Sequence, residues 1–209
     1  MKNPIRVLII ESQTLIRIGL RTILQMQEDI EISAEAETSE QGFEIFKKTR
    51  VDVVLMSLRL GASCAIDEIG KFLRFEPHAK IIVLASHAGD AEISGSLASG
   101  AFGYICTDVS EADLLSAVRS VASGKKFIPS NVAGILTENF GQETLTPSER
   151  KILQMIVAGK SNKQIAYDSN VSENTVKTHV KNIFDKLDVS DRTSAATMAI
   201  RRGLVRGDL

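Results

Sequence analysis

Short apolar runs alternate with helix-like segments along the first 124 residues of the chain. Three of these runs carry Val, Ile and Leu at successive positions, as strands buried on both faces require. We predict strands at residues 5–10, 30–36, 51–56, 80–85 and 102–106. The segments between them repeat apolar residues at helical spacing, which predicts helices at residues 14–24, 40–48, 69–75, 92–100 and 111–124.

Strands that alternate with helices indicate a parallel sheet covered by helices on both faces. Five such units fit a flavodoxin-like order, in which chemistry takes place at the carboxyl ends of the first and third strands. In this chain those ends are Glu11 with Ser12 and, on the third strand, Ser57. The nature of this site therefore depends on what surrounds one small neutral hydroxyl.

The second part of the chain is organised differently. Residues 125–143 have the composition of a linker with one short helix, which opens at Pro129 and ends at Gly141. Residues 144–209 then carry the start signals of four short helices, which predict a helix-turn-helix arrangement. These signals are a capping box with Pro at the first helical position, a second capping box and two single N-caps. They stand at Thr146–Glu149, Ser161–Gln164, Ser172 and Asp191.

The third of these helices, at residues 173–187, has two contrasting faces. We predict that the apolar face packs against the core of this part of the chain; it contains Val176, Val180, Ile183, Phe184 and Leu187. The opposite face is cationic and rich in hydrogen-bond donors, which suits phosphates and base edges; it contains Lys177, Thr178, Lys181 and Asn182. For Lys177 alone an ordinary solvated lysine is the preferred interpretation, but the four residues together favour DNA binding.

Charge supports this division without deciding it. Residues 1–140 carry 14 Lys and Arg against 18 Asp and Glu, whereas residues 141–209 carry 11 against 8. A basic second part hints at an anionic partner, although a chance imbalance on solvated faces explains the charge alone equally well. The two cysteines, Cys64 and Cys106, are interpreted as small buried residues in preference to a redox pair. Without a signal peptide or an apolar run of about 18 residues, we predict a cytoplasmic protein with no membrane partner.

Four strand ends resemble those of the receiver domain of response regulators, over residues 5 to about 124. The segments are VLIIES (7–12), VVLMS (53–57), IVLAS (82–86) and GYICTD (103–108), with Tyr104 at the switch aromatic position. The resemblance implies an acidic pair, a phosphoacceptor Asp, a switch hydroxyl and a Lys at these ends. The chain instead has Glu11, Ser12, Ser57, Ala85 and Thr107.

These replacements predict a degenerate phosphorylation pocket. A receiver holds Mg²⁺ with two or three carboxylates, and this set of five residues contains one. The phosphoryl group also needs an acceptor carboxylate and a Lys that neutralises its oxygens. We therefore expect an atypical receiver that neither binds Mg²⁺ tightly nor accepts a phosphoryl group, with no metal and no cofactor.

An enzymatic role for Ser57 is disfavoured. Hydrolase elbows have the pattern GxSxG, whereas the segment here is LMSLR. Of His78, His87 and His179, only His87 lies near the carboxyl end of a strand, and no orienting acid follows it. Because a nucleophile, a base and an orienting group must converge, we predict no catalytic residues and no enzymatic activity.

Residues 145–205 resemble the LuxR-type C-terminal DNA-binding domain, through LTPSERKIL, GKSNKQIA, SENTVKTHVKNIFDKL and SDRTSAA. The resemblance implies that Lys177, Thr178 and Lys181 reach into the DNA groove. It implies backbone phosphate contacts by Thr146, Ser161, Asn162, Lys163, Thr175 and Asn182. It also implies that the fourth helix offers a small-residue surface on which two such domains pair, made by Ala195, Ala196 and Ala199.

Together the two parts resemble a NarL/FixJ-type response regulator. We predict a flavodoxin-like five-stranded α/β receiver domain at 1–124, a linker at 125–143 and an all-α helix-turn-helix domain of four helices at 144–209. The expected function is sequence-specific regulation of transcription, as a homodimer on double-stranded DNA and independent of phosphorylation. The receiver would serve as a dimerisation scaffold through its first and fifth helices. The alternative is a regulator gated by a small ligand or by a regulatory protein that binds the receiver.

Overall fold

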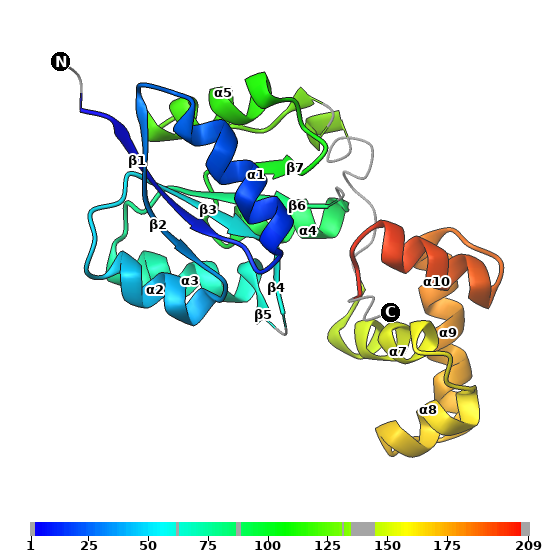
Figure 1. The fold of residues 1–209 in the computed structure, drawn as a ribbon. Coiled ribbons are helices and arrows are strands. Elements are labelled where there is room, and N and C mark those ends of the chain that lie inside the picture. Colours follow the sequence, from blue (N-terminus) through cyan, green and yellow to red (C-terminus); the bar gives the residue numbers. More distant parts are fainter. Residues whose placement is uncertain (1–2, 62, 87–88, 131, 135–144, 206–209) are drawn as a thin grey trace. The chain divides into compact units, whose positions relative to one another are not determined.

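The structure is a computed structural model, and it describes residues 3–61, 63–86, 89–130, 132–134 and 145–205. Two compact units divide the chain, one within residues 1–88 and 93–134 and the other within residues 89–92 and 135–209 (Figure 1). Each unit has its own buried hydrophobic cluster. Part of the linker helix predicted within 125–143 falls at residues 135–144, outside the described residues.

The first unit is built on a parallel five-stranded sheet of order β2-β1-β3-β6-β7. The strands are β1 (Ile5–Ile10), β2 (Ile30–Ala36), β3 (Val53–Ser57), β6 (Ile81–Ala85) and β7 (Gly103–Cys106). All five predicted strands are confirmed, as is the flavodoxin-like order. The sequence pattern was most informative for β3 and β6, because every residue of these strands is buried and apolar residues follow one another.

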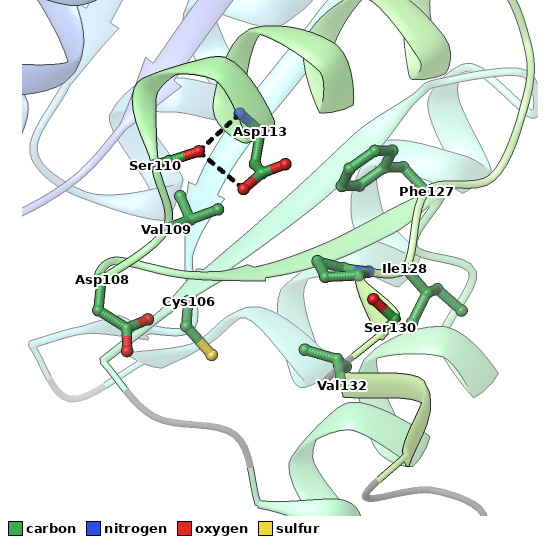
Figure 2. Close-up of a pocket in the computed structure, with 10 residues that line it drawn as sticks. Cys106, Asp108, Val109, Ser110, Asp113, Phe127, Ile128, Ser130 and Val132 are labelled. Carbon is green, nitrogen blue, oxygen red and sulfur yellow. Dashed lines mark hydrogen bonds between the residues drawn. The ribbon is translucent and has the colours of Figure 1, made fainter.

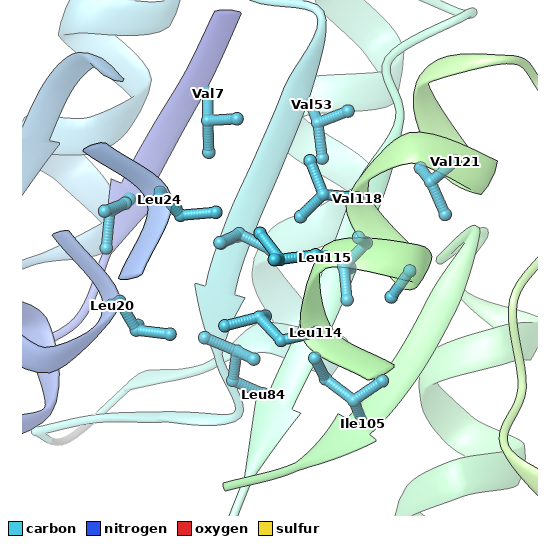
Figure 3. Packing of buried hydrophobic residues seen from close by; sticks show 14 of the residues in the cluster. Val7, Leu20, Leu24, Val53, Leu84, Ile105, Leu114, Leu115, Val118 and Val121 are labelled. Atoms are coloured by element: carbon cyan, nitrogen blue, oxygen red, sulfur yellow. The ribbon is translucent and has the colours of Figure 1, made fainter. Parts of the chain in front are cut away.

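Helices α1 (Thr14–Gln25) and α5 (Glu111–Ala122) cover one face of this sheet (Figure 3). Leu20 and Leu24 of α1, together with a row of α5 residues, pack against side chains from alternate strand positions such as Val7 and Val53. The α5 residues are Leu114, Leu115, Val118 and Val121. Burial of each large aliphatic side chain of this kind contributes roughly 1.5–3 kcal/mol to stability.

The first unit also contains α2 (Ser39–Phe46), α3 (Ala65–Phe75) and, from Ile93 onward, α4 (Asp90–Ala98). Four aromatic rings join α2 to α3, with centroids 5.1–6.2 Å apart. They belong to Phe43, Phe46, Phe72 and Phe75. Gly100 and Gly124 follow α4 and α5 with φ of 105° and 86°, a conformation that favours glycine at a helix end.

The connection from β3 to α3 differs from the prediction. A short antiparallel hairpin, β4 (Arg59–Leu60) with β5 (Ser63–Cys64), follows β3 directly. Gly61 lies in its turn with φ of 62°, which proline cannot adopt. Helix α3 then starts at Ala65, four residues before the predicted start at 69, because its N-cap is Cys64. The Cys64 side chain makes no capping hydrogen bond, so no sequence signal marks this start.

The second unit contains α7 (Pro147–Val157), α8 (Asn162–Ser169), α9 (Glu173–Leu187) and α10 (Arg192–Arg201). Both predicted capping boxes are confirmed, as are the N-caps Ser172 and Asp191. The buried cluster of this unit draws on all four helices. Among the described residues of the whole chain, no helix is long and apolar enough to cross a membrane.

Candidate functional site

The carboxyl edge of the parallel sheet brings the predicted pocket residues together. Strand register pairs Ile10 with Met56, so Glu11 and Ser57 follow side by side on neighbouring strands. Ala85 ends the next strand, and its carbonyl oxygen accepts a hydrogen bond of 2.8 Å from the backbone N–H of Thr107. Ser12 follows Glu11 and is half-buried. The alignment expected from the sequence is therefore present.

Glu11 is the one carboxylate in this group of five, and it is buried with 1% of its surface exposed. Its Oε1 accepts a hydrogen bond of 2.7 Å from the backbone N–H of Gln13, just before α1 begins. Its Oε2 is buried and has no hydrogen-bond partner among the residues that the structure describes. Ser57 is also buried, at 7% exposed, whereas Thr107 is exposed.

A separate cavity of about 650 Å³ lies beyond the end of β7 (Figure 2). Its lining includes Cys106 and Asp108 but none of Glu11, Ser12, Ser57 or Ala85. On one side Ser110 caps α5, accepting a hydrogen bond from the Asp113 backbone N–H and donating one of 2.7 Å to the Asp113 carboxylate. The other lining residues are Val109, the segment Phe127–Ser130, and Val132. Burial, and then the charge of Asp108, raise the pKa of the Cys106 thiol.

Helices α8 and α9 are joined by the short turn that a helix-turn-helix requires. Asn170 ends α8 in the left-handed conformation with φ of 53°, and Ser172 caps α9. The predicted faces of α9 are confirmed. Val176, Ile183 and Leu187 are buried, and Val180 and Phe184 pack against the same cluster. The opposite face is exposed and presents Lys177, Thr178, Lys181 and Asn182.

Five of the six residues expected at phosphates lie at the amino ends of three helices, whereas Asn182 lies further along α9. Thr146 caps α7 and Ser161 caps α8, each accepting a hydrogen bond of 3.3 Å from the backbone three residues later. Asn162 and Lys163 form the first turn of α8, and Thr175 lies in the first turn of α9. Asn162 is half-buried and the other four are exposed. Helix amino ends carry unpaired N–H groups and a positive dipole end, which favour anions.

The prediction for α10 is wrong for two of its three alanines. Ala195 and Ala199 are 0% exposed and belong to the core of their own unit, and Ala196 packs against that core. Their small size lets α10 lie close to the neighbouring helices. A groove of about 280 Å³ on α10 is instead lined by Val189, Thr193, Ser194, Thr197, Met198 and Arg201.

Comparison with known proteins agrees with both units. The family model described as response regulator receiver domain matches residues 7–119, and that of bacterial regulatory proteins, luxR family, matches residues 143–199. The chain is 36% identical over 207 residues to the transcriptional regulatory protein MctR of Rhizobium johnstonii, covering 98% of this chain and 97% of MctR. It is 35% identical over 209 residues to the transcriptional regulatory protein LiaR of Bacillus subtilis, covering 96% and 99%.

Among solved structures, the complex of the two-component response regulator RcsB with DNA is similar, at 25% identity and a TM-score of 0.72. The similarity covers 95% of this chain and 99% of that one. A receiver domain followed by a helix-turn-helix domain defines a two-component response regulator that acts on transcription through DNA. The chain belongs to the LuxR family of these bacterial regulatory proteins.

Proposed function

We propose that the chain is a sequence-specific DNA-binding regulator in which α9 is the recognition helix. The observation that carries the proposal is the division of α9 into a buried apolar face and an exposed face bearing Lys177, Thr178, Lys181 and Asn182. In this proposal Lys177, Thr178 and Lys181 enter the major groove, where Lys donates to guanine O6 and N7 and Thr contacts either base type. None of them is assigned a catalytic role.

Backbone phosphate contacts are proposed for five residues at helix amino ends and for Asn182 further along α9. Thr146, Ser161, Lys163 and Thr175 are exposed there, and Asn162 is half-buried. Asn182, one position beyond Lys181, completes this set. Contacts to phosphates fix the position of a protein on DNA but read no sequence. Loss of one of these residues should therefore weaken binding to all sequences alike.

We further propose that DNA binding does not depend on phosphorylation of the receiver. One carboxylate with hydroxyls at Ser12 and Ser57 does not fit Mg²⁺ as receivers hold it, since that ion prefers several oxygen ligands in octahedral geometry. No group of three or more His, Cys, Asp or Glu that could hold a metal occurs among the described residues. Asp52 does not replace the missing acceptor carboxylate. It lies before the start of β3, at the opposite end from Ser57, and its carboxylate accepts hydrogen bonds from the backbone N–H and the side chain of Arg6.

The active form is proposed to be a homodimer on paired half-sites, joined in part through α1 and α5 of the receiver. Leu15 and Ile18 of α1 are 84% and 42% exposed, unusual for large aliphatic side chains. Beside them a cavity of about 200 Å³ between α1 and α5 is lined mostly by apolar residues, including Ile16 and Leu114. A second copy that covers this surface would remove it from water.

The second candidate is a regulator gated by a small ligand, and the cavity near Cys106 favours it. Its volume of about 650 Å³ lies in the usual range of ligand sites, about 300–1,000 Å³. It lies between the end of β7 and the segment that leads out of the receiver unit. Gating by a regulatory protein at the receiver surface is the other form of this candidate.

A footprint of the purified, untreated protein on genomic fragments tests the proposal. We expect protected sites with two half-sites about one helical turn apart. A thermal-shift assay with a panel of metabolites tests the ligand-gated candidate. That candidate requires one class of compound to raise the unfolding temperature of the protein and to change its footprint. Co-purification of a stoichiometric partner that blocks the footprint would favour gating by a protein.

A further inference from the structure

Arg192 begins α10, and its side chain reaches the turn between α7 and α8. One guanidinium nitrogen, Nη2, donates a hydrogen bond to the carbonyl oxygen of Lys160, and Nη1 donates one of 3.4 Å to Oδ1 of Asn162. The side chain is part-buried, and this burial lowers the pKa of Arg192 below its ordinary value. Arg192 is absent from the contact residues that the sequence pointed to.

The contact with Arg192 decides which way the amide of Asn162 is turned. A guanidinium donates hydrogen bonds and accepts none, so the amide atom that faces it must be the oxygen. The reverse orientation would place two sets of N–H donors against each other. The Nδ2 group of Asn162 therefore points away from Arg192, and no acceptor for it occurs among the residues that the structure describes.

That free amide group lies where an anion would be expected. Asn162 is the first residue of α8, and Ser161 caps the helix by accepting a hydrogen bond from the backbone N–H of Gln164. The backbone N–H groups of Asn162 and Lys163 have no partner within the helix, as in the first turn of any α-helix. A phosphate at this end could meet those N–H groups and the Nδ2 donors together.

We propose that Arg192 is a positioning residue for DNA binding, which holds the amide of Asn162 with its N–H donors turned towards a backbone phosphate. The inference rests on the proposed DNA-binding function. Because Arg192 stands on α10 and Asn162 on α8, the contact also ties the orientation of a phosphate-binding group to the placement of another helix. A purely structural role would consist of the bond to the Lys160 carbonyl alone.

A double-mutant cycle separates these roles. The variants are Arg192→Met, which keeps the aliphatic stem but removes the donors, Asn162→Ala, and both together. Affinity is measured by titration of the full chain on a footprinted fragment. We expect each single variant to bind roughly tenfold more weakly, the weight of one hydrogen bond to a charged group. The double variant should be no weaker than Arg192→Met, because Asn162 has lost its orientation there.

The salt dependence of the affinity gives a second readout. If Arg192 acts through Asn162, its loss leaves the slope of log affinity against log salt unchanged. Two results together would mean that Arg192 itself contacts phosphate. The salt slope of Arg192→Met would be smaller by about 0.9, and adding Asn162→Ala to Arg192→Met would weaken binding as much as it does in the wild type. That result, or single effects that multiply in the double variant, overturns the inference while leaving the proposed function intact.

Two further variants protect the test against a folding defect. Arg192→Lys keeps a charged donor group and should bind within about threefold of the wild type. Asn162→Asp keeps an acceptor for Arg192 but has no N–H donors, so it should fold normally and lose at least as much affinity as Asn162→Ala. Wild-type affinity in Asn162→Asp would overturn the inference. Failure of the wild type to protect any fragment would instead remove the proposed function on which it rests.

Discussion

Lys186 of α9 donates a hydrogen bond of 2.8 Å to the Glu149 carboxylate at the start of α7. The same carboxylate oxygen accepts a hydrogen bond of 2.8 Å from the backbone N–H of Thr146, and Glu149 is 3% exposed. One buried carboxylate thus joins a helix start to the proposed recognition helix. Burial alone would raise the pKa of Glu149, but the hydrogen bonds from Lys186 and Thr146 outweigh it and hold the pKa below its ordinary value.

This pair predicts an acid-sensitive helix-turn-helix unit. Since the pKa of Glu149 is lower in the folded chain than in the unfolded chain, its contribution to stability is full above the unfolded pKa of about 4.3. The contribution is lost as the pH falls through the folded pKa. Replacement Glu149→Ala should cost roughly 3 kcal/mol at neutral pH, the low end for removing one partner of a buried pair. Hydrogen exchange of α7 and α9 amides at several pH values measures this loss.

A matched control for this prediction is Asp168→Ala. Asp168 pairs with Lys160 at 2.8 Å, but both side chains are more than a third exposed. Water screens such a pair, so its removal should change stability by less than about 1 kcal/mol. Equal losses of stability in Glu149→Ala and Asp168→Ala would show that burial does not make the Glu149 ion pair more important for stability than an exposed pair.

Lys181→Ala is predicted to weaken binding to a footprinted site by about 1–3 kcal/mol and to relax base preference at one position. The reason is the place of Lys181 on the exposed face of α9. Fluorescence titration against the site and single-base variants measures both effects. Lys151 of α7, also exposed, is the control, and Lys151→Ala should bind as the wild type does. Unchanged affinity in Lys181→Ala would remove this residue from the interface.

Restoring an acid at position 57 should not restore phosphorylation. The variant Ser57→Asp still has Ser12 and Thr107 where receivers carry an acid and a Lys. It also places a second carboxylate beside buried Glu11, whose Oε2 has no partner among the described residues. We expect Ser57→Asp to unfold at lower temperature than the uncharged control Ser57→Asn, because two close carboxylates repel. Mass spectrometry after acetyl phosphate treatment should find no phosphoryl group, and stoichiometric labelling would contradict the prediction.

Leu15→Glu is predicted to weaken the homodimer. Because Leu15 is 84% exposed, the change should leave the stability of the isolated chain within about 0.5 kcal/mol while placing a charge on the α1 surface. Sedimentation equilibrium measures the dissociation constant of the dimer. Tyr167 of α8 is 88% exposed and lies outside the α1–α5 surface, so Tyr167→Glu is the matched control. Equal dimer constants for the two variants would show that α1 is not part of the interface.

Much of the fold could be predicted from the sequence, for physical reasons visible in particular segments. The strand Ile81–Ala85 is apolar throughout because it is buried on both faces, and Thr146 and Ser161 mark helix starts because their hydroxyls cap exposed N–H groups. The start of α3 was missed because Cys64 offers no capping hydrogen bond.

The candidate site was predictable only in part. The two faces of α9 follow from helical period, but a small side chain at Ala195 fits either an interface or a close helix contact within one unit. The burial of Ala195 shows the second. Arg192 could not have been paired with Asn162, because they are 30 positions apart and the intervening segment contains two turns whose geometry no local pattern defines. Long-range contacts of this kind require the fold.

The most direct test of the account is a footprint titration of the unmodified full chain on genomic fragments, with and without acetyl phosphate and Mg²⁺. We predict protection at the same sites and the same midpoint concentration under both conditions. A midpoint that falls tenfold or more on addition of acetyl phosphate, accompanied by a phosphoryl group on the receiver, would contradict the proposed independence from phosphorylation.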